Sequence, residues 1–374
     1  MSIIIKEITS EQDLKTFIYL PERLHQKHYN WVPPLYIDEK KFFNPKKNPA
    51  FSHNTTALFL AYKNNEVVGR VMGIVPLDFN QLKNVKSARF SYLETNEDEA
   101  VFQALIQKVE DWARQQGCTE MIGPMGFSDK EPQGFLLKGF DEPQMPVTNH
   151  SFPFMVDFIT RQGYKPYIEL CQYEVPLSQE MVNRYDIFAQ RVLQQHQISI
   201  KEFKHIREVK PYVKSVFELI NSTYTDIYGF TKVSEQEAEE FAQRFLPLLN
   251  PRLIKIVTNQ EGKVIAFVIA MPNVNEGIQK AKGHLFPFGW FHILRAMKTS
   301  KRLVLLLGAV QNEMQNKGLD AMLALKLLGS AISLGFKVMD SHLIMKENTK
   351  MRGIIERIDG NRMYKEYGIF RKEI

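Results

Sequence analysis

The residues Leu303-Val304-Leu305-Leu306-Leu307-Gly308-Ala309-Val310, followed by Gln315-Asn316-Lys317-Gly318-Leu319-Asp320, decide the fold. The first run is apolar and has the length of a strand. After the second run, a helix is predicted because apolar residues recur at helical spacing: Met322, Leu325, Leu328 and Ile332. Gly335 ends this helix, and residues 338–345 supply another strand. The order is therefore strand, glycine-bearing loop, helix, strand.

The chain repeats this arrangement, because four segments recur in the same order in its two halves. Residues 3–8 match 198–203 as a first strand, and residues 58–76 match 254–272 as a β-hairpin. Residues 101–124 match 322–339, and residues 154–171 match 351–370, each as a helix, a glycine and a strand. Two copies of one α/β unit are predicted. The alternative is a pair of unrelated α/β domains with similar strands.

The repeat also predicts the domain organisation. Residues 1–177 form an N-terminal domain, 178–197 a helical connector and 198–374 a C-terminal domain. A length of 374 residues suits two domains of ordinary size. The second copy carries an extra aromatic segment between its hairpin and its helix, which includes residues 279–292.

The composition excludes several classes of protein. With 44% hydrophobic and 24% charged residues, each half can bury a core. The net charge of +6 permits an anionic partner, but no long Lys/Arg run predicts nucleic-acid binding. Two isolated cysteines, Cys118 and Cys171, exclude a disulfide framework and a zinc motif, so no metal is expected. A cytoplasmic location is predicted, because the sequence shows neither a signal peptide nor a membrane-spanning run.

The order of elements resembles that of the GNAT superfamily of acyl-CoA N-acyltransferases. The resemblance is strongest in the second half, where Gln315 and Gly318 match the superfamily motif Gln/Arg-x-x-Gly-x-Gly/Ala. Asp320 stands in place of the usual small residue, with Ala321 one position later. The resemblance implies an α/β (α+β) fold of two tandem GNAT-like units. Each unit is expected to be a mixed, mostly antiparallel twisted sheet flanked by helices.

This resemblance implies a binding site for acyl-CoA, carrying an acetyl or a long acyl chain. The free N–H groups and the dipole at a helix start favour a pyrophosphate, glycine lets the backbone come close, and Lys317 adds a cation. The predicted cofactor-binding residues are Gln315, Asn316, Lys317, Gly318, Leu319, Asp320, Ala321 and Asn348. Asp320 either competes with the phosphate or caps the helix. The alternative is an ordinary surface turn capped by Asp320.

The first half lacks such a loop, because its helix is entered by the acidic run Glu94-Thr95-Asn96-Glu97-Asp98-Glu99. One cofactor site is therefore expected, in the second half. The whole chain also resembles a two-copy bacterial GNAT-like family. The residues that carry this resemblance are Ile122 to Ser128, Glu131, Gly134, Gly139-Phe140, Pro143 and Asn149-His150. Some relatives of that family act on long-chain sphingoid amines.

Direct attack of an amine on a thioester needs a base, an oxyanion donor and a proton source. The resemblance implies that the backbone N–H of Ala309 or Val310 is the oxyanion donor. The candidate bases are His342 and Glu347, with Asp340 and His284 as further candidates. Alternation along residues 338–345 predicts that Asp340, His342 and Ile344 share one face. A structural role for His342 is an equally good reading.

The superfamily's usual tyrosine acid is missing. The matching places hold Ile355 and Glu356, whereas Tyr364 and Tyr367 come later, after Gly360. Another residue or the solvent must therefore supply the proton.

The extra segment has two interpretations. Phe286, Phe288, Trp290, Phe291, Ile293 and Leu294, with Lys298, Lys301 and Arg302, either contact a membrane or a lipid through residues 284–302, or pack on the protein or in a homodimer interface.

Three functions are carried forward. The first is acyl transfer from CoA to a primary amine, on a small molecule or a lipid. The second is N-acylation of a sphingoid base at the inner membrane face. The third is a catalytically silent ligand-binding protein.

Overall fold

The computed structural model describes residues 2–180, 182, 191–192, 194–195, 197–225 and 227–374. The strands of the first half are β1 (Ile3–Glu7), β2 (Asn54–Lys63), β3 (Glu66–Pro76), β4 (Ser87–Thr95), β5 (Glu120–Gly123), β6 (Phe135–Lys138) and β7 (Lys165–Pro176). Those of the second half are β8 (Ser199–Glu202), β9 (Ile254–Thr258), β10 (Val264–Pro272), β11 (Arg302–Val310), β12 (Val338–Asp340), β13 (Ile344–Met345) and β14 (Arg362–Glu373).

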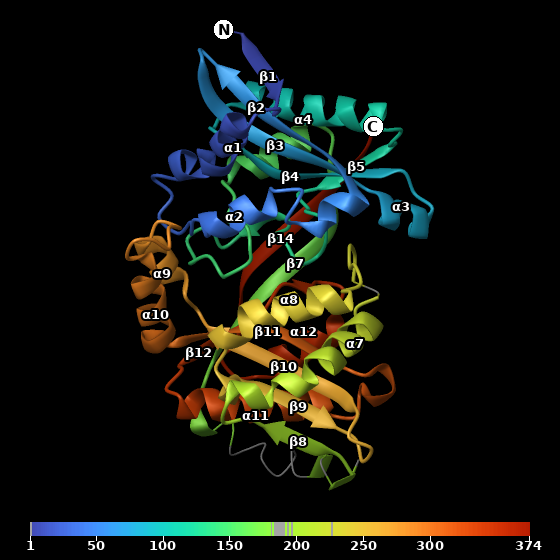
Figure 1. The fold of residues 1–374 in the computed structure, drawn as a ribbon, viewed down its shortest axis with the longest axis vertical. Coiled ribbons are helices and arrows are strands. Elements are labelled where there is room, and N and C mark those ends of the chain that lie inside the picture. The colour runs from blue at the N-terminus through green and yellow to red at the C-terminus, as the bar shows by residue number, and fades with distance from the viewer. Residues whose placement is uncertain (1, 181, 183–190, 193, 196, 226) are drawn as a thin grey trace.

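Helices cover the sheet in both halves (Figure 1). In the first half they are α1 (Glu11–Leu24), α2 (Tyr36–Phe42), α3 (Leu77–Lys83), α4 (Glu99–Gln115) and α5 (Phe154–Arg161). In the second half they are α7 (Val213–Thr223), α8 (Glu235–Phe245), α9 (Asn275–Lys280), α10 (Gly289–Thr299), α11 (Leu319–Ser333) and α12 (Thr349–Glu356). The predicted hairpins, β2–β3 and β9–β10, are confirmed. Most of the expected connector, residues 178–197, lies outside the described residues.

A single sheet runs through the whole molecule. Its order is β1-β2-β3-β4-β5-β14-β7-β12-β11-β10-β9-β8, with β6 beside β14 and β13 beside β7. Only two neighbouring pairs along this order are parallel, β4 with β5 and β11 with β12. The expected fold of two GNAT-like units, each a mostly antiparallel sheet flanked by helices, is confirmed.

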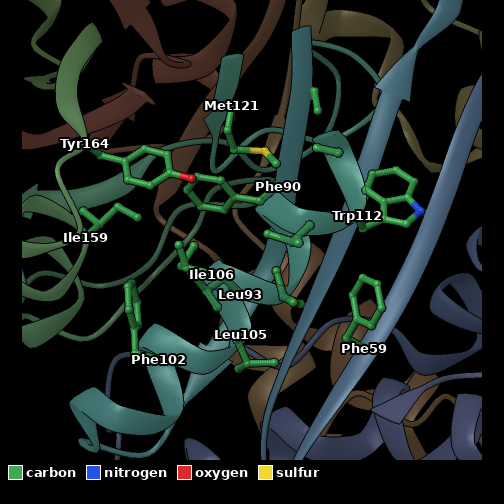
Figure 2. Packing of buried hydrophobic residues seen from close by; sticks show 14 of the residues in the cluster. Phe59, Phe90, Leu93, Phe102, Leu105, Ile106, Trp112, Met121, Ile159 and Tyr164 are labelled. Atoms are coloured by element: carbon green, nitrogen blue, oxygen red, sulfur yellow. The ribbon is translucent and has the colours of Figure 1, made fainter. Parts of the chain in front are cut away.

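Each half buries one apolar cluster on either side of the sheet. In the first half, α4 and α5 cover one face and α1 the other. In the second half, α11 and α12 cover one face and α7 the other. Figure 2 shows the cluster under α4, where Trp112 lies over the β2–β3 hairpin. This close packing needs Gly73, because a Cβ atom there would lie 2.7 Å from the Trp112 ring.

The last strand of each half pairs with the other half. β14 ends the chain but lies between β5 and β7, and β7 in turn pairs with β12. The two strands therefore cross the middle of the molecule side by side, and the C-terminus lies in the first half (Figure 1). The division at residues 177 and 198 stays a prediction, and this exchange of strands joins the two predicted domains into one sheet.

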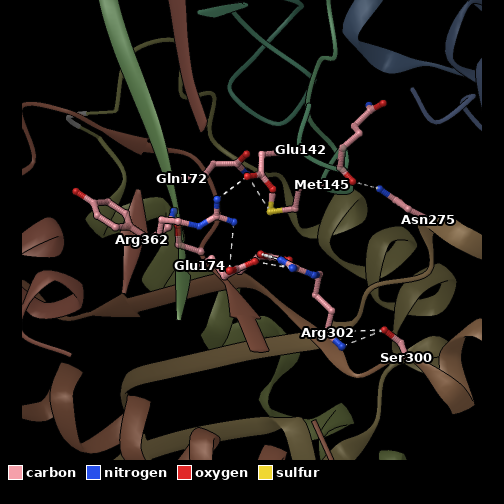
Figure 3. A network of polar contacts seen from close by, with 12 residues as sticks. Glu142, Met145, Gln172, Glu174, Asn275, Ser300, Arg302 and Arg362 are labelled. Atoms are coloured by element: carbon pink, nitrogen blue, oxygen red, sulfur yellow. Dashed lines mark hydrogen bonds and ion pairs between the residues drawn. The ribbon is translucent and has the colours of Figure 1, made fainter. Parts of the chain in front are cut away.

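Ion pairs tie the halves together where the exchanged strands meet β12 (Figure 3). Arg302, at the start of β11, pairs with Glu174 of β7 and with the buried Asp340 of β12. Arg362 of β14 pairs with Glu142 and Glu174. Of the two interpretations of residues 284–302, the one with membrane or lipid contact therefore loses Arg302, because its guanidinium is held by two carboxylates at the junction.

The predicted strand over residues 338–345 is interrupted. Asp340 pairs with Glu174 and Ile344 with Cys171, so four steps along one strand match three along β7. Such an irregularity turns the later side chains to the other face. Glu174 and Cys171 lie on opposite faces, so Asp340 and Ile344 do too, and the expectation that they share a face is wrong.

Candidate active site

β11 and β12 open away from each other and leave a V-shaped gap in the second half. They pair in parallel only over Arg302–Val304 and Val338–Asp340. Beyond Val304, β11 remains paired with β10 as far as Val310, whereas the chain after Asp340 follows β7. One edge of β11 is therefore free of strand pairing over residues 305–310.

The hydrogen-bonding pattern shows which backbone groups face this gap. The Gln311 N–H donates to Ile265 O of β10 at 2.8 Å, and in an antiparallel ladder alternate residues face the partner. Ala309 therefore also faces β10, whereas Gly308 and Val310 face the gap. Of the two expected oxyanion donors, the N–H of Val310 is suitably directed, and the N–H of Gly308 joins it. The N–H of Ala309 is not directed at the gap, because it points toward β10, with which Ala309 is paired.

Side chains bind the carbonyl groups on the same edge. The Tyr224 hydroxyl donates to Gly308 O at 3.0 Å, and Gln315 Nε2 donates to Val310 O at 3.3 Å. Tyr224 directly follows α7, and burial raises its pKa to about 12, so the hydroxyl stays protonated at neutral pH. No sequence pattern marks Tyr224, because the contact joins residues far apart in the chain.

The loop between β11 and α11 has a backbone suited to an anion. Asn316 and Gly318 both have left-handed conformations, with φ angles of 60° and 81°. Gly318 is the N-cap of α11 and brings no side chain to the helix start. The first-turn N–H groups of α11 have no intrahelical partners, so this end of the helix suits a phosphate. Lys317 is exposed beside it.

Asp320 is not the N-cap of α11, because the helix begins one residue earlier, at Leu319. Its Oδ1 nevertheless accepts a hydrogen bond from the Ala321 N–H at 2.9 Å. The carboxylate therefore occupies one of the donors that a pyrophosphate would use. Leu319 itself is buried in the core.

The first-half counterpart of this loop is arranged differently. Asp98 caps α4 by accepting a hydrogen bond from the Val101 N–H, and it pairs with Lys63. The Met125 N–H donates to Phe90 O at 2.9 Å, so the chain after β5 folds back against β4. A cavity of about 390 Å³ near the end of β4 is lined by Glu97 among others. These carboxylates make this helix start unfavourable for a pyrophosphate.

The predicted bases are not brought together. His342 is half-buried beside the gap, and burial lowers its pKa to about 4, so it is a weak base at neutral pH. Glu347 is exposed. Asp340 is committed to Arg302, and His284 stacks on Tyr19 in the first half. Asn348 caps α12 by accepting from the Met351 N–H at 3.0 Å.

A first-half loop reaches the same region. Lys130 Nζ donates to Thr231 O of the second half at 3.3 Å, and the charge of Asp129 adds to the effect of burial in raising the pKa of Tyr224. Glu131 Oε2 accepts from the Ser128 N–H at 2.6 Å, and burial raises the pKa of Glu131 to about 7. The resemblance marked Ser128 and Glu131, but the sequence did not indicate that their loop contacts the second half.

Within the described ranges, no group of three or more His, Cys, Asp or Glu side chains is placed to hold a metal ion. The two cysteines, Cys118 and Cys171, are buried and unbridged.

The extra segment forms α9 and α10. Its first part docks on the first half, where the Tyr36 N–H donates to Gly283 O at 3.0 Å and Gln279 Nε2 donates to Trp31 O at 2.9 Å. The large apolar side chains beyond this point are exposed, from 44% for Leu294 to 75% for Phe286: Phe286, Phe288, Trp290, Phe291 and Leu294. The described part of the chain therefore leaves much of the surface of these five side chains uncovered. No helix within the described residues is both long enough and apolar enough to span a bilayer.

The splayed parallel pair and the helix start beyond it are features of the GNAT acyltransferase fold. A solved structure with the same overall fold is the tandem GNAT protein from the clavulanic acid biosynthesis pathway. The TM-score is 0.56 at 12% identity, over 100% of this chain and 98% of that one. The chain is thus a tandem GNAT-fold protein.

Comparison with curated protein sequences identifies the family of this chain more narrowly. It is 30% identical to the bacterial ceramide synthase of Caulobacter vibrioides, over 98% of this chain and 96% of that protein. It is 27% identical to Protein YghO of Escherichia coli, over 99% and 95% of the two chains. No family model matches the sequence. The chain belongs to the family of the bacterial ceramide synthase, a family of GNAT-fold acyltransferases.

Proposed function

We propose that this protein transfers a long acyl group from acyl-CoA to the amino group of a sphingoid base. The observation that carries the proposal is the 30% identity to a bacterial ceramide synthase along nearly the whole of both chains. A ceramide is an N-acylated sphingoid base, so this reaction is acyl transfer to a lipid amine. The open edge of β11 supports the proposal, because acyl transfer needs backbone donors for an oxyanion.

In this proposal, the second half binds acyl-CoA. The start of α11, with Lys317 and the left-handed residues Asn316 and Gly318, binds the pyrophosphate. The N–H groups of Val310 and Gly308 stabilise the negative charge that develops on the thioester oxygen. CoA supplies the activated thioester. Tyr224 holds β11 in place through Gly308 O. The first half, residues 1–177, walls the acceptor side of the gap.

The exposed aromatic surface of α10 supports contact with a membrane. Trp290, Phe291 and Leu294 lie within one helical turn, and Lys298 follows one turn later on the same side. Aromatic side chains beside exposed lysines are typical of a helix that lies in an anionic bilayer surface. A sphingoid base and its acylated product partition into lipid, so an enzyme acting on them gains from this position. A cytoplasmic protein at the inner membrane face fits this proposal.

The test is an assay of the purified full chain with acetyl-CoA or palmitoyl-CoA and with sphinganine or a short primary amine, followed by mass spectrometry of the products. N-palmitoyl sphinganine as the main product supports the proposal. If only the short amine is acetylated, the proposed ceramide-forming activity is replaced by the first function above, acyl transfer from CoA to a small primary amine. Absence of product from every pair, together with unmeasurable binding of CoA by calorimetry, would leave a silent ligand-binding protein.

A further inference from the structure

The loop Ser128–Glu131 belongs to the first half and contacts the second half. Arg89, which is fully buried on β4, holds its beginning by donating from Nη1 to Gly126 O at 3.0 Å and to Phe127 O at 2.8 Å. Lys130 reaches across to Thr231 O in the second half. A loop fixed at both ends in this way presents its side chains at a defined position.

Two charged groups in this loop region have unmet hydrogen-bonding capacity. Asp129 Oδ1 is buried without a hydrogen-bond partner in the part of the chain that the structure describes. The same holds for Arg89 Nε and Nη2, although the guanidinium stacks on the Phe79 ring 5.0 Å away. Buried donors and acceptors normally find partners, so two such groups whose charges act on each other point to a ligand. That ligand must offer a donor to Asp129 and an acceptor to Arg89.

A series of contacts connects this loop to the open strand edge. Lys130 is bonded to Thr231 O, the Phe230 ring lies 5.8 Å from the Tyr224 ring, and the Tyr224 hydroxyl is bonded to Gly308 O on β11. Burial raises the pKa of Asp129 itself, against the opposing effects of Lys130, its own backbone N–H and Arg89. Glu131 is the other carboxyl group in the loop, and its Oε2 is held by the Ser128 N–H. Asp129 is therefore the less constrained of the two carboxylates, and its charge acts on Tyr224.

We propose that Asp129 binds the ammonium group of the acceptor and removes its proton, so that the first half supplies the catalytic base for a thioester bound by the second half. Arg89 donates to an oxygen next to the amine, which makes the acceptor an amino alcohol or amino ketone with a long chain. This inference rests on the proposed function and adds to it the site of the acceptor head group.

The proton balance is simple. The ammonium group gives one proton to the Asp129 carboxylate, and the neutral nitrogen then attacks the thioester carbonyl carbon. A C–N bond forms, the C–S bond breaks, and the sulfur leaves with the bonding electrons as the CoA thiolate. The second proton of the nitrogen neutralises the thiolate. Asp129 releases its proton to solvent, so an ammonium and a thioester become an amide, a thiol and one proton.

The experiment compares the full chain with its Asp129→Asn variant, using palmitoyl-CoA and sphinganine. At neutral pH, kcat/KM for the amine should fall roughly 100-fold or more, the usual effect of losing a general base. The Kd for CoA, measured by calorimetry, should stay within about twofold. At about pH 10 much of the free amine is already neutral, so the variant should recover most of its rate. Exposed Asp141, in the same first-half segment, provides the control variant Asp141→Asn, which should keep the wild-type rate.

The outcomes separate the two proposals. A wild-type protein that forms no amide with any acceptor contradicts the proposed function, and Asp129 then has no substrate to deprotonate. An active wild type with an equally active Asp129→Asn variant overturns the inference alone. A loss that is the same at every pH also overturns it, because it indicates a structural role. A second measurement is the Kd for sphinganine in the presence of CoA, which Asp129→Asn should raise even without turnover.

Discussion

The hydroxyl oxygen of Tyr224 lies 3.0 Å from the carbonyl oxygen of Gly308, to which it donates a hydrogen bond. Gly308 belongs to the part of β11 that has lost its second strand partner, and its carbonyl would otherwise be unpaired on that side. Tyr224 therefore gives this carbonyl on the open edge of β11 a hydrogen-bond donor, and it links the end of α7 to β11. This bond fixes the position of the N–H groups that we assign to the oxyanion.

Replacing Tyr224 by phenylalanine should lower kcat/KM about fivefold to tenfold, which corresponds to about 1 kcal/mol for one lost hydrogen bond. The ring stays in place, so the Kd for CoA should change little. Steady-state rates with palmitoyl-CoA and sphinganine check this result. Tyr29, which is 92% exposed, provides the control Tyr29→Phe with wild-type rates. An unaltered rate for Tyr224→Phe would show that this bond does not position β11 for catalysis.

Replacing Gly318 by tryptophan should weaken CoA binding at least about tenfold in calorimetry, because a bulky side chain would stand where the pyrophosphate is expected. Gly262→Trp is a matched control. Gly262 has a similar φ angle of 80°, and nothing lies within 4 Å of a Cβ atom there, in the β9–β10 turn. Both variants carry comparable backbone strain, so only a direct role of the loop distinguishes them. Equal affinities in the two variants would move the CoA site elsewhere.

Glu39 gives a prediction about stability and pH. Burial raises its pKa in the folded protein to about 7, above the ordinary value of 4.5. The folded state therefore binds this proton more tightly than the unfolded state, and its stabilising effect is lost as pH rises from about 4.5 to about 7. Glu39→Gln removes that loss, so the variant should gain stability over the wild type across this range, by about 1–3 kcal/mol at pH 8. Urea unfolding at several pH values measures this difference. Exposed Glu66→Gln should show no such trend.

Changing Trp290 and Phe291 together to serine should abolish most binding to vesicles that contain anionic phospholipid. Both side chains are exposed on α10, so the variant should unfold at the wild-type temperature. Sedimentation with vesicles of phosphatidylglycerol and phosphatidylcholine measures the bound fraction. Leu82→Ser removes an 80% exposed apolar side chain elsewhere and should bind normally. If the wild-type protein does not bind vesicles but forms dimers in analytical ultracentrifugation, we would assign the exposed apolar surface of α10 to self-association.

The sequence predicted elements whose patterns are local. The β2–β3 hairpin, β11 and α11 follow from runs of neighbouring residues, and so does the glycine loop. Within α11 the buried face is rotated, with Leu323 and Leu327 buried and Leu325 only partly so, because neighbouring helix positions differ little in apolar character. The exchange of β7 and β14 was not predictable, because it pairs strands far apart in the sequence and no local pattern specifies a strand's partner.

The site was predicted less well, for physical reasons. The loop around Gly318 has a local signature, whereas the contact of Tyr224 with Gly308 depends on how α7 packs on the sheet. The prediction that Asp340 and Ile344 share a face failed because one irregularity near Ser341 reverses the alternation of side chains along residues 338–345. No residue type marks this irregularity in the sequence. The role that we propose for Asp129 depends on contact between the halves, which no local pattern encodes.

The crossing of β7 and β14 has a consequence for how the protein is built. Neither half completes its own sheet, since β14 of the second half pairs with β5 and β7 of the first half pairs with β12. A gene cut within the connector should therefore yield two fragments that are insoluble apart yet reconstitute when co-expressed. The present polypeptide then resembles a covalently fused, strand-swapped dimer, in which we propose that one partner binds the thioester and the other its acceptor.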